Sequence, residues 1–150
     1  MAMDDRTGNI IPFNKIRESI QQGYVSSRWK TSAEYIKRKL TDGKVIGHTI
    51  TIGSRKSKMY MRIYDKAMEQ GINQNTKENT KQSIVHGVDT DDSWIRIEME
   101  IRQERAEKLQ DILLFEDDIG RVYAKIINNY IRFLEPSNDS NRGRWPTAPW

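Results

Sequence analysis

The spacing of apolar residues changes along the chain from helical to strand periodicity and back. Residues 12–22 predict a helix, because a proline can open it, apolar side chains recur at helical spacing and Gly23 can end it. Residues 31–43 carry a short apolar stripe and predict either a short helix or an irregular strand. The segments "VIGHTITIGS" and "KMYMRIYDK" then alternate, which predicts two paired strands joined by a turn at residues 53–57.

The second half of the chain predicts one more strand and two helices. "SWIRIEMEIR" alternates as a strand, and the stretch after it predicts two helices that are broken around residues 116–120 and stopped at Pro136. Residues 72–90 are polar and predict a mobile loop. We therefore expect an α+β fold, a mainly antiparallel sheet with helices on one face, over residues 1–136, with a loop-like tail over residues 137–150.

Alternation divides the predicted strands into an apolar and a polar face. Met59, Met61 and Ile63 should face the core, because successive side chains of a strand point to opposite sides. The polar face then carries Tyr60, Arg62, Tyr64 and Lys66, joined from the third strand by Trp94, Arg96, Glu98, Glu100 and Arg102. Such a face is either the solvent side of an ordinary sheet, with cross-strand pairs such as Arg62 with Glu98, or a platform for nucleic acid. Periodicity alone favours the ordinary sheet.

Composition and charge narrow these alternatives only slightly. The 150 residues are 36% hydrophobic and 31% charged, with a net charge of +4 and no cysteine, which is typical of one globular domain without disulfides. No apolar run is long enough for a membrane helix, and "MAMDDRTGN" has neither the cationic start nor the apolar core of a signal peptide, so we expect a cytoplasmic protein. Two cation clusters suit phosphate contacts: Arg28, Lys30, Lys37, Arg38 and Lys39, and then Arg55, Lys56, Lys58, Arg62 and Lys66. The alternative is a solvated helix face and a charged edge strand that guards against aggregation, and for the first cluster alone this alternative is favoured.

Two motifs on and around the polar face indicate a protein family. "TIGSRKSKMYMRIYDKAMEQG", followed after a polar spacer by "WIRIEMEIRQERAEKL", resembles the paired motifs of rolling-circle replication initiators of Gram-positive plasmids and of relaxases of integrative conjugative elements. The start of the chain, "AMDDRTGNIIPFNKIRESI", resembles the early acidic strand and helix of that family, but the match begins within the strand. We therefore expect a partial replication-initiator or relaxase domain that lacks the upstream part of a longer protein.

The resemblance implies a tyrosine nucleophile that attacks a DNA phosphodiester and leaves a 5′-phosphotyrosine and a free 3′-OH. Tyr64, in "RIYDK", is the candidate, with Arg62 and Lys66 on its own face. The implied cofactor is Mg²⁺ or Mn²⁺, held by Glu98, by Asp4 or Asp5 and by Asp65, with Glu100 as the fallback because it shares the face of Glu98. Alternation points Asp65 away from Tyr64 unless the strand ends there. The candidate DNA contacts are Arg28, Lys30, Arg55, Lys56 and Lys58.

Two functions from different classes stay open. The first is a metal-dependent, site-specific DNA nicking and joining enzyme of plasmid replication or conjugative transfer; the second is a noncatalytic DNA-binding remnant of such a protein. The resemblance implies a single-stranded or cruciform origin site as the partner, no membrane, and allows a homodimer and a helicase partner. The His-x-His metal pair of many nicking enzymes is absent, and we expect His48 and His86 to be surface residues. Trp94 and Trp145 are candidates to stack on bases of single-stranded DNA. The alternative is edge packing for Trp94 and contact with a missing segment for Trp145.

Overall fold

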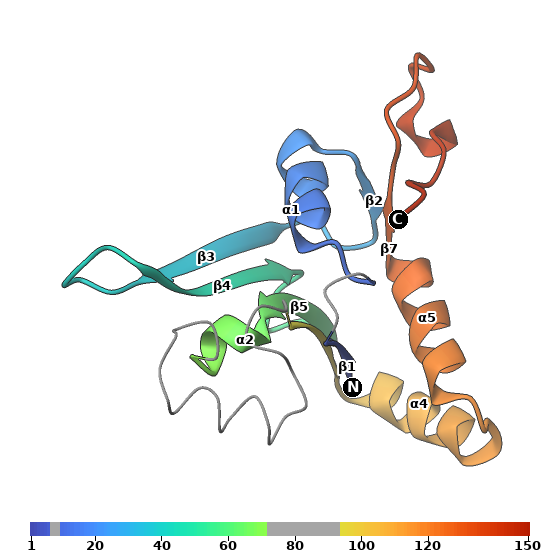
Figure 1. The fold of residues 1–150 in the computed structure, drawn as a ribbon. Coiled ribbons are helices and arrows are strands. Elements are labelled where there is room, and N and C mark those ends of the chain that lie inside the picture. Colours follow the sequence, from blue (N-terminus) through green and yellow to red (C-terminus); the bar gives the residue numbers. More distant parts are fainter. Residues whose placement is uncertain (7–9, 72–93) are drawn as a thin grey trace.

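A five-stranded antiparallel sheet forms the centre of the molecule. The computed structural model describes residues 1–6, 10–71 and 94–150. The strand order is β1-β6-β5-β4-β3 (Figure 1). The strands are β1 (Ala2–Asp5), β3 (Ser32–Arg38), β4 (Val45–Ile52), β5 (Met59–Asp65) and β6 (Ile95–Ile101). The predicted hairpin of β4 and β5 and the third strand β6 are confirmed.

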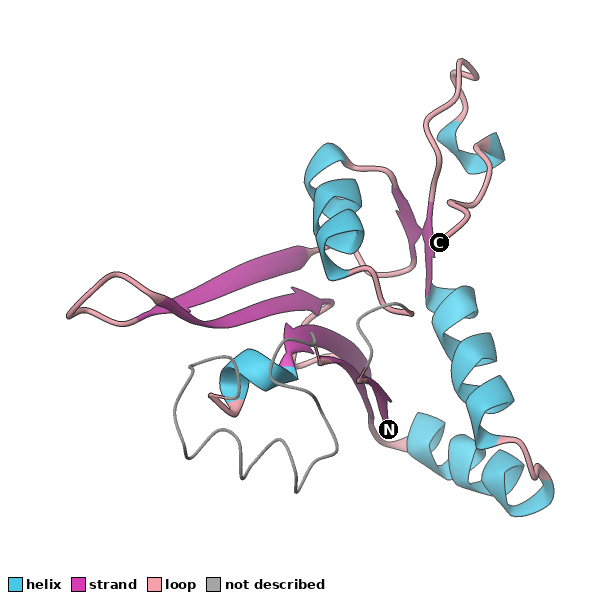
Figure 2. Cartoon of the chain, in the orientation of Figure 1, coloured by secondary structure: helices cyan, strands magenta, loops and turns pink. Residues whose placement is uncertain are grey.

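Helices and a small second sheet complete the α+β fold (Figure 2). The helices are α1 (Phe13–Gln22), the short α2 (Lys66–Glu69), α4 (Glu104–Phe115) and α5 (Ile119–Tyr130). Strands β2 (Val25–Ser27) and β7 (Ile131–Phe133) pair with each other. A 3₁₀ turn, η1 (Arg142–Arg144), lies in the C-terminal tail.

One face of the central sheet is the core, as the alternation predicted. Met59, Met61 and Ile63 of β5 are buried there together with the matching residues of β6. Helix α1 contributes Ile16 to this cluster and α5 contributes Tyr123, whose hydroxyl donates a hydrogen bond to the Ile97 carbonyl at 3.0 Å. Helices α1 and α5 therefore pack on the core face of the sheet.

The structure decides between two open alternatives and corrects two predictions of detail. Residues 32–38 form the strand and not the helix, because they pair with β4 along their whole length, with a register shift between Lys37 and Arg38. Helix α5 ends at Tyr130 rather than at Pro136, because the chain extends there to pair with β2. The tail folds back instead of being loop-like throughout, since Leu134 bridges Thr147 and Ala148 is buried. The loop predicted over residues 72–90 lies outside the described residues.

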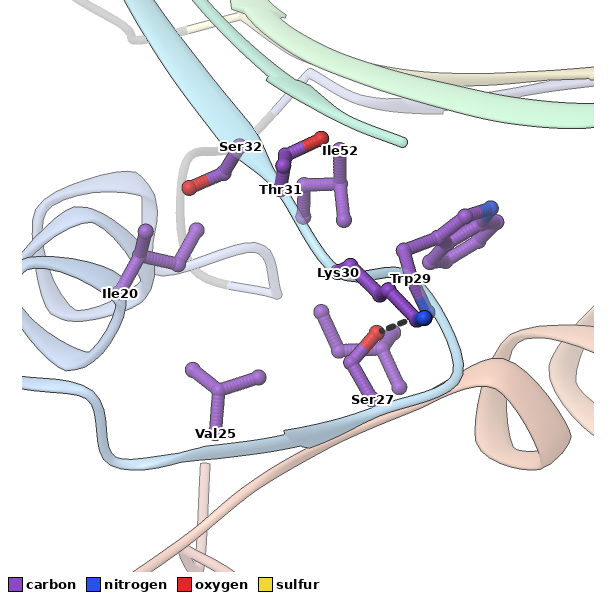
Figure 3. A pocket seen from close by; sticks show the side chains of 9 residues that line it. Ile20, Val25, Ser27, Trp29, Lys30, Thr31, Ser32 and Ile52 are labelled. Carbon is purple, nitrogen blue, oxygen red and sulfur yellow. Dashed lines mark hydrogen bonds between the residues drawn. The ribbon is translucent and has the colours of Figure 1, made fainter. Parts of the chain in front are cut away.

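The turn between β4 and β5 depends on a glycine. Gly53 has a φ of +85°, and a Cβ on it would lie 2.5 Å from Cδ1 of Trp29, so no larger residue fits. Trp29 is fixed by its indole nitrogen, which donates to the Met59 carbonyl at 3.0 Å. Beside Trp29 lies a hollow of about 230 Å³, where the Trp29 amide donates to Ser27 Oγ (Figure 3). Its lining holds one ionisable side chain, Lys30, so it offers no acid–base pair.

None of the helices in the described part of the chain is both long and apolar enough to span a bilayer.

Candidate active site

Strand register brings the candidate residues into two neighbouring rows on the polar face. In the first row Asp4 of β1 lies opposite Arg96 of β6, Arg96 lies opposite Tyr64 of β5, and Tyr64 lies opposite Thr49 of β4. In the second row Glu98 lies opposite Arg62. Residues that lie directly opposite share a face, so these six side chains from four strands lie on the same face of the sheet.

Tyr64 and Glu98 make the central contact of this face. The Tyr64 hydroxyl donates a hydrogen bond to Glu98 Oε1 at 2.8 Å, and Arg62 Nε donates to Glu98 Oε2 at 2.5 Å. The cations of Arg62 and Lys66 lie 5.6 and 5.7 Å from the centre of the Tyr64 ring. The predicted grouping of Tyr64 with Arg62, Lys66 and Glu98 therefore exists in the structure.

The pKa values of Tyr64 and Glu98, the two partners of this hydrogen bond, are shifted in opposite directions. Burial, and then the hydrogen bond to Glu98, raises the pKa of Tyr64 to about 12. Burial opposes ionisation of Glu98, but hydrogen bonds from Tyr64 and Arg62 outweigh it and hold the pKa of Glu98 below its usual value. At neutral pH the phenol is therefore protonated and the carboxylate beside it is ionised.

Arg96 connects the carboxylates of two strands. Its guanidinium donates to Asp4 through two nitrogens, at 2.5 and 2.8 Å, and its Nη1 lies 3.7 Å from Glu98 Oε1. The bond to Arg96 is the main cause that lowers the pKa of Asp4. Sequence analysis placed Arg96 on the polar face but gave it no role, because the register of β1 against β6 is not encoded in either strand alone.

The second cation beside Tyr64, Lys66, begins helix α2 and forms an ion pair with Glu69. Asp65 is the cap of this helix, since its Oδ1 accepts a hydrogen bond from the Met68 amide at 2.8 Å. The cap fixes the direction in which the chain leaves β5, directly after Tyr64.

Two of the proposed metal ligands lie on the opposite face of the sheet. Asp5 is 2% exposed, and its Oδ2 accepts hydrogen bonds of 2.7 Å from the amides of Ile10 and Ile11. Asp65 alternates away from Tyr64 and caps α2, and burial raises its pKa. The structure therefore does not bring Asp5 or Asp65 together with Tyr64 and Glu98, because strand alternation sends their side chains to the core side.

Glu100 and Tyr60 form a separate group further along the polar face. They lie opposite each other, Glu100 pairs with Arg102, and Arg55 Nε donates to the Tyr60 hydroxyl at 3.4 Å. A hollow of about 420 Å³ lies between this group and the Arg62–Glu98 pair. Tyr60 is thus four residues from Tyr64 on the same face and does not contact Glu98.

The carboxylates fit a divalent cation only in part. The described residues contain no group of three or more histidine and acidic side chains arranged to hold a metal ion. Glu98 and Asp4 offer hard oxygen donors on one face, which suits Mg²⁺ or Mn²⁺, but both are paired with Arg96. The structure therefore supplies two candidate ligands, and further ligands would have to come from solvent or from a bound phosphate.

The predicted DNA-contact cations lie around the β4–β5 turn. Arg55 and Lys56 are exposed in this turn, and Lys58 pairs with Glu104 of α4. Lys30 is exposed, and the Arg28 guanidinium lies 5.4 Å from the centre of the Tyr130 ring. These side chains belong to the end of the sheet that is farther from Tyr64.

The tryptophans and His48 prove to be structural in their contacts. Trp94 is 2% exposed, and the guanidinium of Arg96 lies 5.7 Å from the centre of its ring. Trp145 packs on Tyr24 with a ring separation of 5.7 Å. His48 lies partly exposed on strand β4, where its Nε2 is 2.5 Å from Glu34 Oε1 of β3. His86 lies outside the described residues.

Comparisons with known proteins show the family of the chain. A family model described as "Replication initiation factor" matches residues 1–150. The protein named "Putative DNA relaxase NicK" of Bacillus subtilis (strain 168) is 32% identical over 149 residues, which are 99% of this chain and 39% of that relative. The solved rolling circle replication initiator protein from Geobacillus stearothermophilus superposes with a TM-score of 0.75 at 27% identity, over 98% of this chain and 49% of that chain. The chain thus spans less than half the length of both, and it belongs to the replication initiation factor family.

Proposed function

We propose that this chain carries the nicking and joining site of a rolling-circle replication initiator or conjugative relaxase, with Tyr64 as the nucleophile. The observation that carries the proposal is the hydrogen bond from the Tyr64 hydroxyl to Glu98 Oε1. Three cations lie beside this pair: Arg62 and Lys66 at the Tyr64 ring, and Arg96 at Glu98. A phenol is a weak nucleophile while it keeps its proton, so it needs a proton acceptor at its oxygen and positive charge near the phosphate. Family membership and similarity to a relaxase and an initiator support DNA as the substrate.

The chemistry follows from these contacts. The Tyr64 oxygen attacks the phosphorus, the Oη–P bond forms and the bond from phosphorus to the 3′ oxygen breaks. The phenol proton passes to Glu98, and the departing 3′ oxygen takes a proton from solvent water to become a free 3′-OH. Arg62 and Lys66 stabilise the negative charge that develops on the phosphate oxygens. The reverse attack by a 3′-OH on the phosphotyrosine rejoins the strand.

A divalent cation completes the proposal. Glu98 and Asp4 would hold Mg²⁺ or Mn²⁺, with Glu100 as the alternative to Asp4. When bound, the cation would polarise the phosphate oxygens and add to the positive charge that the arginines supply. The carboxylates would have to exchange part of their contact with Arg96 for the cation, since Arg96 contacts both of them.

A strand-labelling assay tests the proposal. Single-stranded origin DNA is incubated with the chain and Mn²⁺, with the label at the 3′ end in one sample and at the 5′ end in the other. We expect the 3′ label to migrate with the protein after denaturation, because the 5′-phosphate of that fragment becomes bonded to tyrosine. The 5′-labelled fragment should be free and extendable by a polymerase. If both labels stay with full-length DNA, the proposal fails.

One observation favours a second candidate, a noncatalytic DNA-binding module. Glu98 and Asp4 are both paired with arginine, and the Tyr64 ring is buried, so DNA and metal would have to open these contacts first. The same assay separates the candidates, because a module shifts the mobility of the DNA under native conditions but leaves neither label on the denatured protein.

A further inference from the structure

Strands β3 and β4 continue beyond the sheet as a two-stranded arm, which we name the β3–β4 ribbon (residues 32–52). Only residues 49–52 of β4 pair with β5, whereas the pairing of β3 with β4 runs on to Arg38 and Val45. Figure 1 shows the ribbon extending past β5 to a loop that stands away from the body. Among the described strands, only β3 and β4 pair with each other towards the tip, and β3 is the edge of the sheet.

The tip of the ribbon has an excess of unpaired positive charge. Residues 37–47 contain four cations and one acid: Lys37, Arg38, Lys39, Lys44 and Asp42. Asp42 accepts a hydrogen bond from the Lys44 amide at 3.0 Å. Within the described parts of the chain, none of these four cations forms an ion pair. By contrast, five cations at the centre and the end of the polar face each form one: Lys58, Arg62, Lys66, Arg96 and Arg102.

Tyr35 extends the row that contains the nucleophile. It lies opposite Thr49, which lies opposite Tyr64, so Tyr35 shares the polar face two strands away, roughly 10 Å at the usual strand spacing. Lys37, two residues further along β3, lies on the same face opposite Gly47. The ribbon therefore continues the polar face from Tyr64 outward.

Tyr35 also differs from the other aromatic side chains of this face in its exposure to solvent. It is 59% exposed, whereas Tyr60, Tyr64 and Trp94 on the same face are 5%, 6% and 2% exposed. An exposed aromatic ring beside unpaired cations is the arrangement with which proteins bind single-stranded nucleic acid, because a base stacks on the ring and the cations contact the backbone. An edge strand that only had to avoid aggregation would need the charges but not the ring.

We propose that single-stranded DNA next to the scissile phosphate runs from Tyr64 along the β3–β4 ribbon, with a base stacked on Tyr35 and a phosphate at Lys37. This inference rests on the proposed function, because it takes the phosphate at Tyr64 as the starting point of the strand. The remaining tip cations, Arg38, Lys39 and Lys44, then attract the strand without reading its sequence.

Binding without cleavage tests this inference separately from the nicking chemistry. The affinity of the 150-residue chain is measured in EDTA by fluorescence anisotropy, with a mixed-sequence single strand of roughly 20 nucleotides and with the matching duplex. We expect Tyr35→Ala to weaken single-strand binding about tenfold and to change duplex binding less than twofold. Tyr35→Phe should bind like the wild type, because phenylalanine keeps the stacking face.

Ile36→Ala is the matched control, since Ile36 is an exposed neighbour on the opposite face of β3 and its removal should leave affinity unchanged. Wild-type affinity in Tyr35→Ala, or an equal loss for the duplex, would overturn the inference, as would a wild-type chain that binds no DNA. A Tyr35→Ala variant that changes the sedimentation coefficient would show instead that the edge pairs with a second copy. Loss of nicking with normal Tyr35-dependent binding would count against the proposed function only.

Discussion

The centre of the polar face and the β3–β4 ribbon carry cations in opposite ways. At the centre, Arg62 and Arg96 pair with Glu98 and Asp4, so charge is balanced within hydrogen-bonding distance. On the ribbon, the four cations at the tip form no ion pair within the described chain and the Tyr35 ring is open. Tyr35 and Lys37 of the ribbon lie on the same face of the sheet as the centre, and the row from Asp4 to Tyr35 links the two regions.

The difference teaches which physical job each region can perform. A cation that is already paired releases few counterions when DNA arrives, so the centre contributes little to nonspecific affinity, but its fixed charges can stabilise a transition state. An unpaired exposed cation releases counterions when DNA binds and so adds to nonspecific affinity, but it is not held in place to stabilise a transition state. We therefore expect changes at the centre to affect the chemical step, and changes on the ribbon to affect binding and its dependence on salt.

The largest expected effect is the loss of the nucleophile. Tyr64→Phe should lower covalent attachment to DNA by on the order of 10⁴-fold or more, because no other group on the face can take the place of its oxygen. DNA binding should stay within about twofold, since the Tyr64 ring is buried. Tyr60→Phe is the matched control and should retain most of the activity; an adduct that survives in Tyr64→Phe would refute the assignment. Both are measured on denaturing gels.

Next in size is the proton acceptor. Glu98→Gln keeps the shape of the side chain but removes the charge, and we expect nicking in Mn²⁺ to fall roughly 10²–10⁴-fold. Nicking by the Glu100→Gln variant should fall far less, because Glu100 does not contact Tyr64. If instead Glu98 matters only as a cross-strand ion pair, thermal unfolding would shift by less than about 1 kcal/mol and nicking would persist.

Removal of the ribbon charges should have an intermediate effect and only on binding. Replacing Lys37, Lys39 and Lys44 by alanine should reduce the slope of log affinity against log salt by about 2, since each phosphate contact on a single strand contributes roughly 0.7. Lys58→Ala, which removes a cation that is already paired with Glu104, should change the slope less. Equal changes in both variants would remove the distinction between the two regions.

The smallest expected effect is that of pH. The pKa of Glu98 is held below its usual value, so the acceptor stays ionised above about pH 5, and the pKa of Tyr64 is raised to about 12, so the phenol stays protonated below about pH 11. The rate of nicking should therefore vary less than about threefold between pH 6 and 9. A tenfold rise per pH unit would mean that free phenolate, rather than transfer to Glu98, supplies the nucleophile.

Some strands could be predicted from the sequence and others could not, depending on whether the residue types or only backbone pairing define the strand. The alternation of β5 and β6 was visible because methionine and isoleucine side chains on one face alternate with tyrosine, arginine and glutamate side chains on the other. No residue of β3 is buried, so its strand character comes from backbone pairing with β4, which leaves no pattern in the residue types. The three-residue strands β2 and β7 pair across more than a hundred residues and could not have been found from local signals.

The same reasoning applies to the site. Tyr64 and Glu98 were predicted on one face from alternation, and the pairing of Arg62 with Glu98 is confirmed. The choice between Asp4 and Asp5 needed the register of β1, which puts Asp4 beside Arg96 and turns Asp5 to the core. Tyr35 and Arg96 carried no signal of their own, because only the sheet places them in one row with Tyr64.

The most direct test of the account is the site of the covalent bond to DNA. Trypsin cleaves after Lys58, Arg62 and Lys66, so it separates the peptide of residues 59–62, which holds Tyr60, from the peptide of residues 63–66, which holds Tyr64. After reaction with single-stranded origin DNA and digestion of the attached strand, mass spectrometry should find the nucleotide mass on the peptide of residues 63–66. The same mass on the peptide of residues 59–62 would contradict the account.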